Sequence, residues 1–177
     1  MRMFNKILYF CIIISYFIYV KFLCDDNLGK LARYLRMMGY DTYFRSSISD
    51  AELLAVMFKQ NRFVLTRDNN LVKSIELDRY LLIETDSPDE QLKSVIVQKK
   101  LQIDKSEYFS RCFECNEICI DVSGEDIINE VFPYLIKIHQ SFKRCPVCRR
   151  IYWQGSHYKH MEDKLQTIIN ELDSFKH

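Results

Sequence analysis

Two pairs of cysteines and a set of separated aspartates are the residues of this chain whose types and spacing predict chemistry. The cysteines stand as Cys112-x-x-Cys115 and Cys145-x-x-Cys148. A two-residue gap lets both thiolates of a pair reach one metal ion, and four thiolates complete the tetrahedral coordination of Zn²⁺. The segment between the pairs is longer than in a usual zinc finger, but a zinc ribbon tolerates it, because the entropic cost of closing a loop grows slowly with its length. We therefore expect a structural zinc ribbon.

The remaining cysteines bear on the cellular compartment. The chain has seven cysteines, an odd number that does not suit a disulfide framework. Two short paired motifs favour metal binding and a reducing compartment, so we expect a cytoplasmic protein. Cys24 and Cys119 are interpreted as small buried apolar residues.

The aspartates lie where strands are expected to end. Asp25 and Asp26 follow an apolar run, Asp68 follows another, and Asp50 lies at the start of an expected helix. Carboxyl ends of parallel strands share one edge of a sheet, which is where ligands bind. Carboxylates converging there repel one another unless a divalent cation neutralises them. Oxygen ligands suit Mg²⁺ or Mn²⁺, which can activate water for phosphodiester hydrolysis. The predicted catalytic and metal-binding set is Asp25, Asp50 and Asp68.

Each acid also has a simpler interpretation. Asp50 could complement the dipole of its helix, and Asp26 could be a solvated loop residue. Asp68 could pair with Arg67 or cap the short helix expected to begin at Asn69. The shared placement at one sheet edge is what favours the metal site.

The first half of the chain has the pattern of an α/β domain. Apolar runs of strand length alternate with helical periodicity and helix-start signals, such as the capping box Ser49-x-x-Glu52. Such alternation predicts a parallel sheet covered by helices on both faces. The expected strands are 20–24, 41–44, 63–66 and 80–83. The expected helices are 28–38, one from residue 50, a short one at 69–73, and 88–100.

The pattern changes from about Tyr108, where cysteines, turn residues and short β-like runs replace the alternation. We therefore divide the chain into a hydrophobic leader (1–19), an α/β domain (20–105) and a zinc ribbon with a C-terminal helix (106–177). Apolar residues recur at helical spacing near the end, and we expect this helix to pack back on the first domain. They are Met161, Leu165, Ile168, Ile169 and Leu172.

The leader has three interpretations. The run Ile7–Val20 is apolar but shorter than the roughly 18 residues wanted for a membrane-spanning helix. It has the length of a signal-peptide core, yet no small-residue cleavage site follows. It could be a membrane anchor, an uncleaved signal, or the result of a start placed too far upstream of Val20, which we favour. Membrane contact is expected only if residues 1–19 are genuine.

Net charge is +1, which argues against a broadly basic nucleic-acid binder, so any contact with a polyanion must come from local clusters. Basic residues step along the first helix and flank the second cysteine pair, where they could hold a phosphodiester backbone. They are Lys30, Arg33, Arg36, Lys143, Arg144, Arg149 and Arg150. Tyr152 and Trp153 could stack on bases. The alternative is solvated surface for the basic residues and core for Trp153.

Several segments together resemble one known family. FLCDDNLGKLARYLRMMGYD (22–41), SDAELL (49–54) and VLTRD (64–68) are similar to the PIN-like RNase domain first described at the C-terminus of the Mut-seven exonuclease. RCFECN (111–116), CPVC (145–148) and IYWQGSHY (151–158) match its second module in the same order. The resemblance covers about residue 20 to the end.

The resemblance implies a PIN-like α/β fold, a zinc ribbon and Mg²⁺- or Mn²⁺-dependent cleavage of RNA, with no small-molecule cofactor. By position, Asp25, Asp50 and Asp68 match the family's acids, and Thr66 belongs to the motif that orients Asp68.

Two alternative functions remain. One is an inactive RNA-binding or ribosome-associated adaptor. The other is a phospho-acceptor domain of receiver type, although no fifth strand followed by a lysine is offered.

Overall fold

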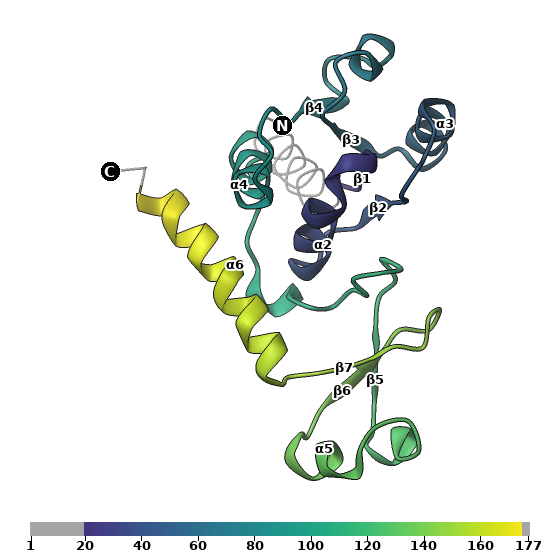
Figure 1. Cartoon of the computed structure of the whole chain (residues 1–177), viewed down its shortest axis with the longest axis vertical. Coiled ribbons are helices and arrows are strands. Elements are labelled where there is room, and N and C mark those ends of the chain that lie inside the picture. Colours follow the sequence, from purple (N-terminus) through teal and green to yellow (C-terminus); the bar gives the residue numbers. More distant parts are fainter. Residues whose placement is uncertain (1–19, 175–177) are drawn as a thin grey trace, which may run out of the picture.

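The computed structural model describes residues 20–174, and its first part is built on a four-stranded parallel sheet (Figure 1). The strand order is β2-β1-β3-β4, so the chain moves outward from β1 to β2 and then crosses to the other side of β1. The predicted α/β class is therefore confirmed. The strands are β1 (Phe22–Cys24), β2 (Thr42–Phe44), β3 (Phe63–Thr66) and β4 (Tyr80–Leu82).

Helices cover both faces of this sheet. Successive residues of a strand point to opposite faces, so each strand contributes side chains to two separate cores. Phe22 and Cys24 face α2 (Gly29–Met37) and α4 (Pro88–Gln98) in the main core. Leu23, between them, faces a second core that contains α3 (Asp50–Gln60). The parallel sheet ends at β4 in the described part of the chain, so it offers no fifth strand to complete a receiver-type site.

Local sequence signals set several element boundaries. The predicted capping box forms, with Ser49 and Glu52 exchanging side-chain and backbone hydrogen bonds at the start of α3. Gly39 ends the α2 segment with φ +88°, a conformation that side chains disfavour. A Cβ there would also lie 2.8 Å from the carbonyl oxygen of Glu107. The short helix expected at 69–73 is instead a single 3₁₀ turn, Leu71–Ser74.

The second part contains a small antiparallel sheet with the order β5-β6-β7. Its strands are β5 (Ile120–Val122), β6 (Phe142–Arg144) and β7 (Ile151–Trp153). The connection between β5 and β6 holds a 3₁₀ turn (Glu125–Ile127) and α5 (Pro133–Ile138), neither of which the sequence pattern predicted. The cysteine pairs lie before β5 and between β6 and β7, which is the arrangement expected for a zinc ribbon.

The last helix, α6 (Ser156–Ser174), returns along the first part of the molecule (Figure 1). Leu165, Ile168 and Ile169 are buried in the main core beside α2 and α4, as the helical periodicity predicted. Tyr108 and Phe109 enter the same core, so apolar packing crosses the predicted boundary at residue 105.

The expectations for the leader fall on residues 1–19, which lie outside the described residues. Among residues 20–174, no helix combines the length and the apolar character needed to cross a bilayer.

Candidate metal centres

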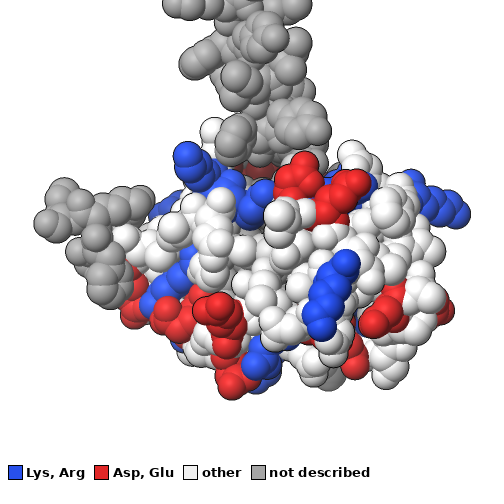
Figure 2. Space-filling model, turned by 90° about the horizontal axis from the view of Figure 1, so that it is seen from above, with Lys and Arg blue, Asp and Glu red and all other residues white. Residues whose placement is uncertain are grey.

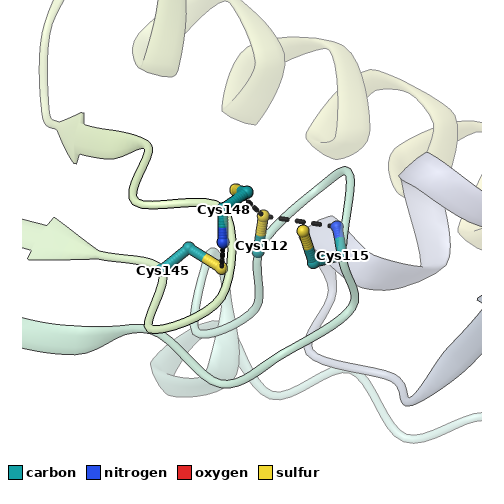
Figure 3. A group of neighbouring side chains, drawn as sticks. All are labelled: Cys112, Cys115, Cys145 and Cys148. Atoms are coloured by element: carbon teal, nitrogen blue, oxygen red, sulfur yellow. Dashed lines mark hydrogen bonds between the residues drawn. The ribbon is translucent and has the colours of Figure 1, made fainter.

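The four paired cysteines converge on one point (Figure 3). Their Sγ atoms all lie within 4.8 Å of one another, and those of Cys112 and Cys148 are 3.6 Å apart. Cys112 and Cys145 are buried, whereas Cys115 and Cys148 are half-buried. Within the described chain this is the only such group of three or more possible ligands. Four sulfurs at this spacing fit a tetrahedral Zn²⁺.

The two loops that present these thiolates have the same backbone geometry. In each, the amide of the second cysteine donates to the first sulfur, at 3.4 Å in Cys115–Cys112 and 3.5 Å in Cys148–Cys145. The residue that follows takes a left-handed conformation, with φ +66° at Asn116 and +64° at Arg149. The two loops therefore share one turn geometry, and we call them the first and second knuckles (residues 112–116 and 145–149).

The surroundings of Cys112 favour the thiolate that a metal needs. Burial opposes ionisation, but the Tyr152 hydroxyl donates to Cys112 Sγ at 3.1 Å and, with nearby amides, lowers the pKa of Cys112 to about 7. The Tyr152 hydroxyl thus supports the cysteine cluster. Cys119 lies beside the cluster without belonging to it, and burial raises the pKa of its thiol to about 12.

A buried arginine attaches the first knuckle to the α/β part. Arg36 is only 3% exposed, and its guanidinium donates to the carbonyl oxygens of Thr42, Phe113 and Glu114 at 2.6–3.0 Å. The prediction that Arg36 contacts RNA is therefore corrected. The Arg36 side chain points inward from α2, and its hydrogen bonds join the start of β2 to the first knuckle.

The side chain of Asn116 completes this junction. Its amide donates to Asp41 Oδ1 at 2.6 Å and accepts from the amide of Thr42 at 2.8 Å. Arg62 also donates to Asp41 Oδ1, at 2.7 Å. The sequence reasoning missed this role. The available signal was an asparagine directly after a Cys-x-x-Cys pair, because asparagine tolerates the left-handed conformation there.

A second group of side chains lies at the carboxyl edge of the parallel sheet. Asp25 directly follows β1, is 8% exposed, and its amide donates to the carbonyl of Leu65 on β3 at 3.0 Å. The Thr66 hydroxyl donates to Asp25 Oδ2 at 2.7 Å and accepts from the amide of Asp68 at 2.9 Å. Strand order places β1 and β3 side by side, so Thr66 links Asp25 to the backbone of Asp68.

The third predicted acid is not joined to this pair. Asp50 is exposed at the first position of α3, where it also suits the helix dipole. The oxygens of Asp25, Asp50 and Asp68 do not form a group within ligand distance among the described residues. Asp68 Oδ1 accepts from the amide of Asn70 at 2.6 Å, so it caps the following turn, while Arg67 pairs with Asp86.

The edge nevertheless retains unneutralised charge. Within residues 20–174, Asp25, Asp50 and Asp68 have no salt bridge to a lysine or arginine. Asp26 is likewise exposed, and its Oδ1 accepts from the amide of Ser47 at 2.7 Å. Asp25 and Asp68, whose backbone is tied to Asp25 through Thr66, lie with the exposed Asp26 and Asp50 near the ends of β1 and β3, and carboxylate oxygens are the donors that a hard divalent cation prefers.

The basic residues predicted to contact RNA divide by exposure. Arg144 is 9% exposed, pairs with Glu130 and donates to the carbonyl of Asp126, so its predicted role is also corrected. Lys143 is half-buried and pairs with Asp121. The exposed members are Lys30, Arg33, Arg149 and Arg150. On the face shown in Figure 2, acidic and basic groups are interspersed rather than gathered by sign.

Comparisons with known proteins place this architecture in a family. No curated protein matches the chain. The model of one protein family does match, and it spans the parallel sheet, both knuckles and the first half of α6. That model is described as the Mut7-C RNAse domain and covers residues 20–165, so the chain belongs to the Mut7-C RNAse domain family.

Proposed function

We propose that this protein is a Mg²⁺- or Mn²⁺-dependent ribonuclease whose reaction takes place at the carboxyl edge of the parallel sheet. Family membership points to a nuclease. The observation that supports this position is the Asp25–Thr66–Asp68 link, because it fixes a buried carboxylate beside a second acid at the ends of adjacent strands. Free thiols and a four-cysteine cluster suit a reducing compartment, so the proposal places the enzyme in the cytoplasm.

Each residue of the edge has a distinct task. Thr66 holds the Asp25 carboxylate in one orientation, and among residues 20–174 no arginine or lysine forms an ion pair with Asp25 that would compete with a cation. Asp68 and Asp50 lie more exposed and approach from the β3 end and from α3. Their side chains can move onto a cation, because neither is buried. A divalent cation held there would supply activation of water and neutralisation of the phosphodiester.

Zinc has a different task. The four thiolates fill its coordination, so the ribbon stabilises the fold and leaves no open position for substrate. Exposed arginines near the second knuckle would help to hold RNA.

The test is cleavage of labelled RNA by Asp25→Asn and Asp68→Asn variants in the presence of Mg²⁺ or Mn²⁺. Loss of a ligand should reduce the rate by at least about 100-fold, because loss of residues that merely support ligands costs 10- to 100-fold. Asp163→Asn, at an exposed position of α6, is the matched control and should cleave normally. Full metal-dependent activity in Asp68→Asn, with unchanged zinc content, would refute the proposal.

One observation favours an alternative, an RNA-binding adaptor without turnover. The three acids do not lie within ligand distance as a group in the described structure. Calorimetric titration of the zinc-loaded protein with Mn²⁺ separates the two functions. Binding that Asp25→Asn abolishes supports the nuclease, whereas RNA binding with no uptake of Mn²⁺ supports the adaptor.

A further inference from the structure

The second knuckle borders an open groove that the acidic edge and the cysteine cluster do not account for. Its volume is about 460 Å³. One wall comes from α5 and the residues before it, and the other comes from the second knuckle and β7. The residues that matter here are Phe132, Leu135, Arg149, Arg150 and Trp153.

Two aromatic side chains line this groove. Phe132 is 80% exposed, so its ring is free to contact a ligand. Trp153 is half-buried, with its ring tilted against His139 at 6.4 Å. A Cβ at Gly155 would lie 2.9 Å from Trp153 Nε1, so a glycine is needed for the indole to take this position. The groove thus has one fixed and one free aromatic ring.

The charged side chains at the groove that lack a full partner of opposite charge are arginines. Glu130 lines the groove but is paired with the buried Arg144. Arg149 is exposed and forms no salt bridge within the described residues. Arg150 lies 3.1 Å from Glu114, a carboxylate that also binds Arg33 at 2.6 Å. Two guanidinium groups therefore share one negative charge.

The shared carboxylate also joins the groove to the α/β part. Arg33 lies on α2, and Lys30 is exposed one turn earlier on the same helix. The α2 helix begins immediately after the turn that starts at Asp25. Exposed cations are therefore placed in sequence from the groove, across Arg150 and Arg33, to the helix end beside the acidic edge.

We propose that the groove binds unstacked bases of single-stranded RNA, whose backbone continues over Arg150, Arg33 and Lys30 toward Asp25. This inference rests on the proposed ribonuclease function and names its substrate class. Aromatic rings stack on any base whose face is free, and arginines hold the phosphates beside it. A duplex keeps its bases stacked inside and offers neither ring a face. Paired RNA should bind poorly for this reason.

The chain provides its own reporter, because Trp153 is its only tryptophan. The zinc-loaded Asp68→Asn protein, full length, is titrated with a single-stranded oligoribonucleotide and with its duplex at low salt. We expect saturable quenching of Trp153 fluorescence by the single strand and at least about tenfold weaker binding of the duplex. Equal affinity for both, or binding without any change in Trp153 emission, would overturn the proposal.

Two variants locate the contact. Phe132→Ala and Arg149→Asn should each weaken binding of the single strand about tenfold or less. Asparagine suits the left-handed backbone of residue 149 and already occupies the equivalent position 116, so the fold is retained. Phe58→Ala is the control, since Phe58 is 62% exposed on α3, far along the chain from the groove. Unchanged affinity in both groove variants would refute the assignment and leave the surface to a protein partner.

Cleavage by the wild-type protein is measured in parallel, so the two proposals can fail separately. Binding that quenches Trp153 without any cleavage refutes only the ribonuclease. Metal-dependent cleavage that is insensitive to Phe132→Ala and Arg149→Asn refutes only the groove.

Discussion

The cysteine cluster and the acidic edge of the sheet are assembled in different ways. Each knuckle is a turn of five residues whose own amide-to-sulfur bonds aim the thiolates, and the four sulfurs already lie within 4.8 Å of one another. The acids come from three separate elements, and only Asp25 and Asp68 are linked, through Thr66. Local backbone geometry brings the four thiols together, whereas the cation site that we propose between separate elements would need its cation to bring the acids together.

The two regions are nevertheless coupled through the first knuckle. Arg36, Asp41 and Asn116 connect the knuckle to the end of α2 and the start of β2. The main core also contains residues from both parts. Loss of the cluster should therefore affect the α/β part, and the variants below measure how strongly.

The largest effect is expected from removing one zinc ligand. Cys145→Ser should abolish stoichiometric zinc binding and lower the free energy of unfolding by on the order of 5 kcal/mol, because a structural metal contributes directly to folding. Zinc analysis and thermal melting measure both. Cys119→Ser is the matched control, since Cys119 is buried beside the cluster but is not one of the four ligands. Equal zinc loss in both variants would contradict the four-cysteine site.

Cutting the junction should cost less. Arg36→Met keeps the apolar stem of the side chain but leaves three carbonyl oxygens without their donor, so we expect a loss of about 3 kcal/mol. Chemical denaturation gives the value. Arg33→Met, one turn earlier, removes only an exposed pair and should change stability by less than about 0.5 kcal/mol. If the two variants behave alike, Arg36 does not hold the junction.

The acidic edge can be probed without removing an acid. Thr66→Val keeps the shape of the side chain but removes the hydroxyl that orients Asp25 and accepts the amide of Asp68. We expect a loss of about 1–3 kcal/mol in stability, together with reduced Mn²⁺ affinity, because buried polar groups lose their partners. Thr66→Ser retains the hydroxyl and should restore most of both quantities. Normal metal affinity in Thr66→Val would show that the link is only structural.

The smallest effect concerns pH. Burial raises the pKa of Asp41, but hydrogen bonds from Arg62 and Asn116 outweigh it and hold the pKa below its ordinary value of 3.8. Ionised Asp41 therefore stabilises the fold above that value, and the contribution is lost as pH falls through the folded-state pKa. Asp41→Asn should lower stability at neutral pH by about 1 kcal/mol and flatten the acid limb of the stability curve. Asp121→Asn, an exposed partner of Lys143, should leave that limb unchanged.

Much of the fold was predictable because its signals are local. Apolar runs predicted β1 to β4, the Ser49–Glu52 box predicted the start of α3, and the two Cys-x-x-Cys pairs predicted the cluster. The corrections share one cause. Arg36 and Arg144 look like surface residues in the sequence, but their environments are set by segments far along the chain, such as Phe113 for Arg36. Periodicity alone does not show which polar face of a helix is later covered.

The sequence by itself determined the strands and main helices of the α/β part, the cysteine cluster and the family, because each depends on residues that are neighbours in the chain. The tertiary structure decided which acids are linked, which arginines are buried and where an aromatic groove opens. Those outcomes depend on strand order and on the docking of the first knuckle, since β1 and β3 become adjacent only when the sheet forms. A side chain's chemistry follows from its type, but its partners follow from packing.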